Sequence, residues 1–475
     1  MVEHGELLYP SLTRVSSHLI RISRDISNHE KQIVEARKCS VKKGLQKFNI
    51  ECSMNSEANE PYELQLGFGG TSTLDKVGSG GGLRAMIALQ GILGELQEQH
   101  LLDIVMYLCG VSGSTWCMSY IYEHEEWGKQ LSSLEDKLCH KLVNPHRDWN
   151  KALKSLVESS KDDTYSLTDF WGIVVVYIIM HELDDHHLSD EQKICKNGIV
   201  PYPIYAAVDA TKLDAAANQI HSDIWFEFTP HEAGFFNPGE FVDVTFLGSK
   251  FENGELKEKK NEMKMTYLRG LWGSAVANFK EDMTVLIGIW DIIKCMYKTL
   301  TCILKWKWGN IYTYKYIDLK DKNLTDKTDI QLADASIVIN SAYPLILRPE
   351  RKVELILSFD FSDGDPFETI KKTNQYCEEN KLPFPEIDAQ NLDKDKDNPG
   401  DCYIFKGNGC PTVMHFPLFN KVNCGGNISD WRNRYKTFSL SYPEQDIKNL
   451  LEATKKNVKN NTKNILQMLK AVANP

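Results

Sequence analysis

The chain has 475 residues, of which 42% are hydrophobic and 25% are charged, and its formal net charge at pH 7 is -10. This composition is typical of a globular protein and excludes a disordered or fibrous chain. The negative balance gives no overall electrostatic reason to bind nucleic acid or anionic lipid, so we predict no nucleic-acid partner.

The N-terminal residues and the cysteine pattern predict a cytosolic protein. Glu3, His4 and Glu6 stand where an export signal would have a basic end and an apolar stretch. The 12 cysteines contain no CxxC pair, so we expect reduced thiols rather than a disulfide framework. The apolar runs 173–180 and 285–293 are shorter than the roughly 20 residues of a membrane-spanning helix, so no transmembrane segment is expected.

In chain order, the first predicted element is a charged amphipathic helix over residues 29–47, part of an N-terminal helical lead-in over residues 1–60. Residues 53–78 are rich in Gly, Ser and Asn and are predicted to be a loop. The glycine run Gly78-Ser-Gly-Gly-Gly82 follows, and a helix begins near Arg84.

The apolar run Asp-Ile-Val-Met-Tyr-Leu-Cys after Leu102 is typical of a buried strand. It leads through Gly110-Val-Ser-Gly-Ser114 into another helix, and this order of strand, tight turn and helix is a unit of an α/β sheet. Residues 353–359 form a second buried strand, and residues 444–472 form an amphipathic helix with lysines on its polar face.

These elements predict one α/β domain over residues 61–475, with a central sheet and surrounding helices, and we expect a cap or lid insertion at about residues 140–330. Within the insertion, residues 285–308 mix Ile and Trp with Lys, a composition that suits a membrane interface. Burial of the same segment against the core is an equal alternative.

Ser112 is the first candidate for chemistry. A serine on a sharp turn between a strand and a helix projects its hydroxyl above the end of the sheet, beside the positive end of the helix dipole. Ser112 holds the central position of the turn, and Ser114 is the competing nucleophile. A structural turn serine is the alternative to both.

The glycine run offers backbone N–H groups that can approach an oxyanion closely. A phosphate-binding P-loop would need Gly-Lys followed by Ser or Thr, but Leu83 and Arg84 follow here. A dinucleotide fingerprint would need a preceding strand, and residues 71–77 are a poor strand. Both nucleotide-binding interpretations therefore fail.

Two further polar segments contain candidate functional residues. His181 and His186 resemble a zinc-binding helix, but the second histidine is at i+5 and leaves the face of the first, so we predict no metal site. Asp334, before Ala335 and Ser336, is in isolation only a loop aspartate.

Four segments, taken together, resemble the group IV cytosolic phospholipases A2. They are residues 79–86 (SGGGLRAM), 110–116 (GVSGSTW), 343–349 (YPLILRP) and 357–362 (LSFDFS). The likeness extends over roughly residues 29–472 and is greatest to members without the calcium-binding C2 domain. It implies that residues 61–475 form a patatin-like catalytic domain with a mixed central sheet and a cap or lid insertion.

This resemblance implies a role for each matching residue. Ser112 is expected to be the nucleophile and Asp334 its base, in a Ser–Asp dyad without histidine, with Gly81 and Gly82 as oxyanion donors. The implied reaction is hydrolysis of the sn-2 ester of glycerophospholipids through an acyl-enzyme, with lysophospholipase or transacylase activity as a close variant.

The resemblance also implies partners. Arg84 and Arg351 are expected to bind the substrate phosphate, because a guanidinium donates bidentately to phosphate oxygens. No metal or cofactor is expected. The expected partner is a glycerophospholipid membrane surface, with the protein in the cytosol and peripherally associated with intracellular membranes.

A catalytically inactive, lipid-binding relative is the alternative from another class. It is motivated by the missing strand before the glycine run and by Ser336, where the family usually has glycine. If that position needed a positive φ, serine would cost about 1 kcal/mol of strain.

Overall fold

The computed structural model describes residues 19–50, 64–69, 81–144, 148–213, 220–252, 254–274, 299, 301–302, 309–312, 329–437 and 439–473. Of residues 64–69, 310–312 and 329, the backbone alone is described. In these ranges, no helix has both the length and the hydropathy needed to cross a bilayer.

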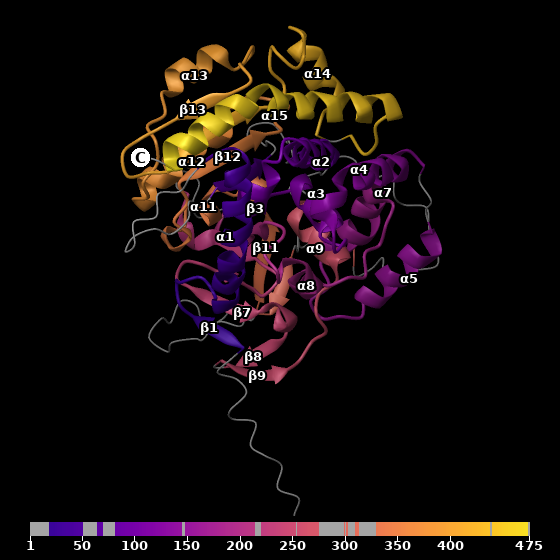
Figure 1. The fold of residues 1–475 in the computed structure, drawn as a ribbon. Helices are drawn as coiled ribbons and strands as arrows, with labels where there is room; N and C mark the ends of the chain where they lie inside the picture. Colours follow the sequence, from indigo (N-terminus) through magenta and orange to yellow (C-terminus); the bar gives the residue numbers. More distant parts are fainter. Residues whose placement is uncertain are drawn as a thin grey trace, which may run out of the picture.

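A mixed sheet, of twelve strands within the described residues, forms the centre of the molecule (Figure 1). Its parallel part runs in the order β14 (Thr412–Pro417), β12 (Leu355–Asp360), β2 (Leu64–Gly69), β3 (Val105–Gly110) and β4 (Tyr202–Asp209). Antiparallel strands extend it: β5 (Trp225–Phe228), β6 (Glu232–Phe235), β7 (Glu240–Asp243) and β1 (Ile20–Ile22) beyond β4, and β13 (Tyr403–Phe405) beyond β14. The predicted α/β fold with a mixed central sheet is confirmed.

β2 corrects the prediction that residues 53–78 are entirely loop. It lies between β3 and β12, and its register pairs Leu66 with Leu108 and Phe68 with Phe359. The segment is short and contains two glycines, so its own strand propensity is weak and its pairing with two neighbours decides its structure. A strand therefore does precede the glycine run, further upstream than residues 71–77.

The predicted helices near the sheet are present. α1 (Asn28–Lys47) begins at Ser27, whose side chain accepts the N–H of Glu30, and it packs across β3 and β4. α2 (Gly82–Glu98) packs between α3 (Gly113–Ile121) and α15 (Glu444–Ala473). The close approach of α2 and α15 requires Gly91, because a Cβ there would lie 2.2 Å from Thr454 Oγ1.

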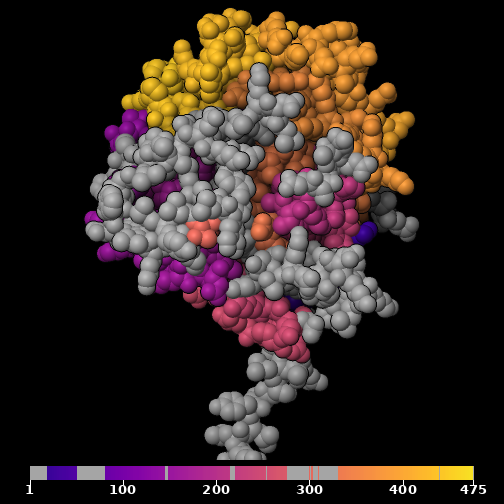
Figure 2. All heavy atoms as spheres, turned by 180° about the vertical axis from the view of Figure 1, so that it is seen from behind, coloured from indigo at the N-terminus to yellow at the C-terminus, as the bar shows by residue number. Residues whose placement is uncertain are grey.

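The remaining helices are α4 (Trp127–Val143), α5 (Trp149–Ser159), α6 (Leu167–Phe170), α7 (Tyr177–Met180), α8 (Glu191–Cys195), α9 (Met265–Trp272), α11 (Tyr343–Ile346), α12 (Glu368–Asn380), α13 (Ala389–Asp395) and α14 (Ile428–Arg434). Seen from behind, the C-terminal residues gather at one end of the molecule (Figure 2). The hairpin of β8 (Lys250–Glu252) and β9 (Glu255–Glu258) lies at the opposite end (Figure 1).

The cap or lid expected at about residues 140–330 stays a prediction. Strands β4 to β7 fall in this range and belong to the main sheet. The membrane-interface hypothesis for residues 285–308 lies outside the described residues, apart from residues 299, 301 and 302.

Candidate functional site

The carboxyl ends of β3 and β11 (Asp329–Asp334) meet beside β4. β3 runs parallel to β4 and pairs Gly110 with Tyr205, whereas β11 runs antiparallel and pairs Asp334 with Ala207. β5 occupies the other edge of β4, so β3 and β11 share one edge and point toward each other. Their end residues are offset by two residues of β4, which is about 6.6 Å. Ser112 is the second residue after β3, and Asp334 is the last residue of β11. The register therefore places the two expected dyad residues near the same edge of β4.

Ser112 has an unusual backbone conformation. Its φ is 52° and its ψ is -133°, and the residue is 2% exposed. A non-glycine residue in such a region costs about 1–3 kcal/mol and persists where the surrounding structure enforces it. The strain lies at the turn from β3 into α3, which is the geometry of a nucleophile elbow.

Ser114, the competing nucleophile, is engaged in the helix. Its Oγ donates a hydrogen bond to the carbonyl oxygen of Val111 at 2.9 Å, and the residue is fully buried. A hydroxyl that closes the first helical turn in this way serves the backbone. The geometry therefore favours Ser112 over Ser114.

The two expected oxyanion glycines lie against the elbow. Gly82 has a φ of 48°, and a Cβ on Gly113 would lie 1.9 Å from the carbonyl oxygen of Gly82. A Cβ on Gly81 would lie 2.4 Å from the Cβ of Ala85. The amino ends of α2 and α3 therefore meet at Ser112, and first-turn N–H groups have no partner within their own helix.

Asp334 is held in a fixed position at the end of β11. It is fully buried, and its Oδ1 accepts the N–H of Ser336 at 2.9 Å. Its own N–H donates to the Oγ of Ser274 at 3.2 Å, and that hydroxyl donates to the carbonyl oxygen of Leu271 at 2.9 Å. Ser274, which follows α9, was not assigned a role from sequence, because its contact with Asp334 spans 60 residues.

Ser336 carries none of the strain considered from the sequence. It lies in the 3₁₀ helix Ala335–Ile337 and is not one of the non-glycine residues with positive φ. Its N–H supports the Asp334 carboxylate instead.

The Arg84 side chain does not face Ser112 as a free cation. It is fully buried, its Nε donates to the carbonyl oxygen of Phe361 at 2.6 Å, and its Nη1 donates to that of Tyr435. Its Nη2 donates to the Oγ1 of Thr437 at 3.1 Å, and Asp363 lies 3.2 Å from Nη1. All three nitrogens thus fix the start of α2, and a phosphate would have to displace one of these partners.

Arg351 lies in a buried ion network between α1 and β5. Its Nε and Nη1 donate at 2.9 Å to Glu30 and at 3.0 Å to Glu227, respectively, and Arg348 also donates to Glu227. Burial would raise the pKa of Glu227, but Arg348 and Arg351 hold that pKa below its usual value. The network satisfies the Arg351 guanidinium within the fold, which favours a structural role.

A strained serine, two adjoining helix amino ends and a buried carboxylate are together suited to acyl transfer. The serine supplies a nucleophile, the carboxylate can accept its proton, and the N–H groups can stabilise an oxyanion. None of the cysteines in the described ranges forms a disulfide.

Comparison with known proteins identifies the family of this chain. Residues 76–366 match the family model described as the lysophospholipase catalytic domain. Human cytosolic phospholipase A2 gamma is 36% identical, with 97% of each chain covered, and the mouse protein of that name is 33% identical, covering 94% of this chain and 91% of its own. Human GIVD cytosolic phospholipase A2 has the same fold, with a TM-score of 0.77 at 23% identity over 96% of this chain and 68% of that one. The chain therefore belongs to the cytosolic phospholipase A2 family and carries its lysophospholipase catalytic domain.

Proposed function

We propose that this chain is a calcium-independent phospholipase A2 that hydrolyses the sn-2 ester of glycerophospholipids with Ser112 and Asp334. Its family makes it a hydrolase of the phospholipase A2 and lysophospholipase class. The observation that carries the finer assignment is the meeting of β3 and β11 beside β4, which brings a strained serine and a buried carboxylate together.

In the first half-reaction, the Ser112 oxygen attacks the ester carbonyl carbon while the Asp334 carboxylate accepts the serine proton. The carbonyl oxygen becomes an oxyanion, and N–H groups at Gly81, Gly82 and the start of α3 stabilise it. The tetrahedral intermediate then expels the alcohol of the lysophospholipid, which takes the proton from Asp334, and the acyl-enzyme remains.

In the second half-reaction, water takes the place of the lysophospholipid. Asp334 accepts a proton from the water as its oxygen attacks the acyl-serine ester. The fatty acid leaves, and the proton returns to the Ser112 oxygen. A lysophospholipid hydroxyl in place of water would give transacylation, so the same dyad supports both activities.

Two observations weaken the alternative of an inactive lipid-binding relative. β2 supplies a strand before the glycine run, and Ser336 has no left-handed φ. The proposed partner remains a glycerophospholipid membrane surface that the protein approaches from the cytosol. Phosphate binding by Arg84 and Arg351 stays a prediction, and it requires rearrangement of the contacts of both side chains.

The test is release of fatty acid from sn-2-labelled phosphatidylcholine vesicles in the presence of a chelator. We expect turnover by the wild type and a loss of about 10³-fold or more in Ser112→Ala and in Asp334→Asn. Ser114→Ala is the matched control and should keep activity within about threefold, because its hydroxyl bonds only the backbone. Activity that survives in Ser112→Ala, or that requires calcium in the wild type, would refute the proposal.

A further inference from the structure

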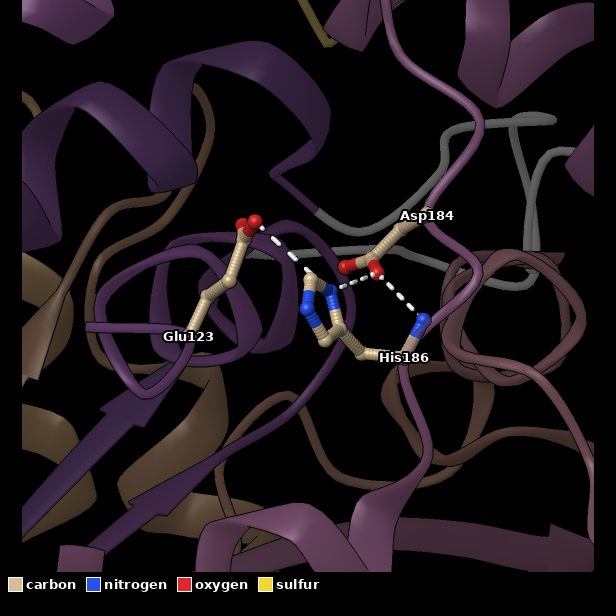
Figure 3. Close-up of side chains that lie close together, drawn as sticks. All are labelled: Glu123, Asp184 and His186. Atoms are coloured by element: carbon tan, nitrogen blue, oxygen red, sulfur yellow. Dashed lines mark hydrogen bonds and ion pairs between the residues drawn. The ribbon is translucent and has the colours of Figure 1, made fainter. Parts of the chain in front are cut away.

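Three side chains of types that can bind a metal ion gather at the end of α3 remote from Ser112. Glu123 follows α3, and Asp184 and His186 lie in the loop after α7. Their ligand atoms all lie within 4.8 Å of one another. Figure 3 shows the imidazole between the two carboxylates. The sequence had paired His186 with His181 and yielded no metal motif, because the partners of His186 in space are acidic residues from two elements.

The spacing of these atoms suits a bound cation. His186 Nδ1 is 2.9 Å from Asp184 Oδ1 and 3.6 Å from Glu123 Oε1. Ligands bound at about 2.1 Å are about 3.0–3.4 Å apart in octahedral or tetrahedral geometry. A cation at Nδ1 would replace the hydrogen bond between His186 and Asp184 and would draw Glu123 closer, with the imidazole neutral and its proton on Nε2.

A second observation points to a ligand at this place. A cavity of about 200 Å³ is lined by the three residues and by Glu191. Glu191 is 3% exposed, and its Oε1 accepts the hydroxyl of Tyr205 at 2.7 Å. Its Oε2 is buried and has no hydrogen-bond partner among the described residues. An unsatisfied buried oxygen is costly, and a cation or one of its water ligands would satisfy it.

The cluster is held in place before any cation binds. The N–H of Met265, the first residue of α9, donates to the carbonyl oxygen of His186 at 2.7 Å. Arg269 Nη2 lies 2.7 Å from Asp184 Oδ2, and Arg269 Nε donates to Ser119 of α3 at 2.7 Å. A preorganised set of this kind loses little conformational freedom on binding.

We propose that Glu123, Asp184 and His186 form a site for one divalent cation of the Zn²⁺ class, with Glu191 lining the same cavity. An imidazole favours Zn²⁺ over Ca²⁺ and Mg²⁺, which take oxygen ligands. The length of α3, about 14 Å for its nine residues, separates this site from Ser112. The cation thus takes no part in the ester chemistry and instead ties α3 to the loop after α7, where it also meets the negative end of the α3 dipole.

The test is calorimetric titration of the chelator-treated, dialysed full chain with Zn²⁺. We expect one Zn²⁺ fewer per chain, or at least about tenfold weaker binding, in His186→Gln and Glu123→Gln than in the wild type. His187→Gln and Glu125→Gln are matched controls, because both residues line the same cavity outside the cluster, and they should bind like the wild type. The wild type and the four variants have the same cysteines, so any Zn²⁺ that cysteines bind contributes equally to all five titrations.

Thermal unfolding of the same proteins provides the second readout. Zn²⁺ should raise the unfolding temperature of the wild type and of both controls, and it should not raise that of His186→Gln. His186 has an exposed side chain, so its variant should match the metal-free wild type in unfolding temperature. Equal stoichiometry and affinity in all five proteins, or no binding by the wild type, would overturn the proposal.

Discussion

At the scale of single residues, the site depends on glycines, because a Cβ atom at their positions would collide with neighbouring atoms. Gly113 lies against the backbone of Gly82, and Gly110 lies against Met118, where a Cβ would be 2.6 Å from the sulfur. These contacts let the amino ends of α2 and α3 approach each other while Ser112 keeps its strained conformation. Close backbone contact between Gly82 and Gly113 thus helps to position the expected oxyanion donors, together with the Arg84 contacts at the start of α2.

Gly113→Ala should therefore impair catalysis. Its Cβ would overlap the Gly82 carbonyl oxygen, which is 1.9 Å away, so the glycine loop or the elbow must shift. Loss of an aligned oxyanion donor lowers kcat by about 10²–10³-fold, and we expect a loss of at least this size in vesicle hydrolysis. Gly364→Ala is the control, because nothing lies within 4 Å of its Cβ position. Equal activity of the two variants would show that the contact does not matter.

Some of these residues were identifiable from sequence and others were not. The sequence predicts Ser112 and the glycine run as candidates, because turn chemistry depends on neighbouring residues. The position of Asp334 beside them depends on the pairing of β11 with β4, and that of Ser274 depends on a contact across 60 residues. The buried partners of Arg84 are also distant in sequence, so the resemblance alone suggested a phosphate ligand.

At the scale of elements, a buried ion network joins α1 to the sheet. Arg351 bonds to Glu30 of α1 and to Glu227 of β5, and all three side chains are at most 1% exposed. The network ties the N-terminal segment to the sheet, and β1 of the same segment pairs with β7. The predicted lead-in helix is present, but the strand that precedes it gave no signal because it has three residues.

Arg351→Met should destabilise the fold by about 3–5 kcal/mol, because it leaves Glu30 and Glu227 buried with lost partners. Urea unfolding followed by circular dichroism measures this change. Arg434→Met should change the free energy of unfolding by no more than about 0.5 kcal/mol, since Arg434 is half exposed. If Arg351 bound the substrate phosphate instead, its variant would lose activity without losing stability.

The strands show where prediction from sequence ends at this scale. β3 and β12 were predicted because their runs are apolar and buried on both faces. β2 was missed because two of its six residues are glycine and the residues that flank it in the sequence are mostly polar. Its place between β3 and β12 comes from tertiary pairing, which overrides weak local propensity.

At the scale of the whole molecule, buried titratable groups set the pH dependence of stability. His415 of β14 is fully buried, and its Nε2 donates to the carbonyl oxygen of Pro366 at 2.8 Å. Its Nδ1 lies 3.2 Å from the hydroxyl of Ser358 on β12. Burial lowers the pKa of His415 to about 4, so the imidazole is neutral in the folded protein.

The contribution of His415 to stability should therefore fall as the pH falls from 6.5 to 4. In this range the unfolded chain binds a proton at His415 that the folded protein does not bind, which amounts to about 3 kcal/mol over the whole range. Urea unfolding at a series of pH values gives the free energy of unfolding as a function of pH. Between the two pKa values, the slope of this curve should correspond to one proton fewer taken up on unfolding in His415→Gln than in the wild type. His140→Gln, which removes an exposed histidine, should leave the slope unchanged. Equal slopes in the wild type and His415→Gln would contradict this assignment.

The central claim is that Ser112 is the nucleophile and that Asp334 activates it. The most direct measurement is peptide mapping by mass spectrometry after reaction with an alkyl fluorophosphonate in chelator, since this reagent phosphonylates an activated serine. We predict one adduct on the peptide that contains Ser112, lost in Ser112→Ala and formed at least about 10²-fold more slowly in Asp334→Asn. An adduct on Ser114, a rate unchanged by Asp334→Asn, or no adduct on the folded wild type would contradict the account.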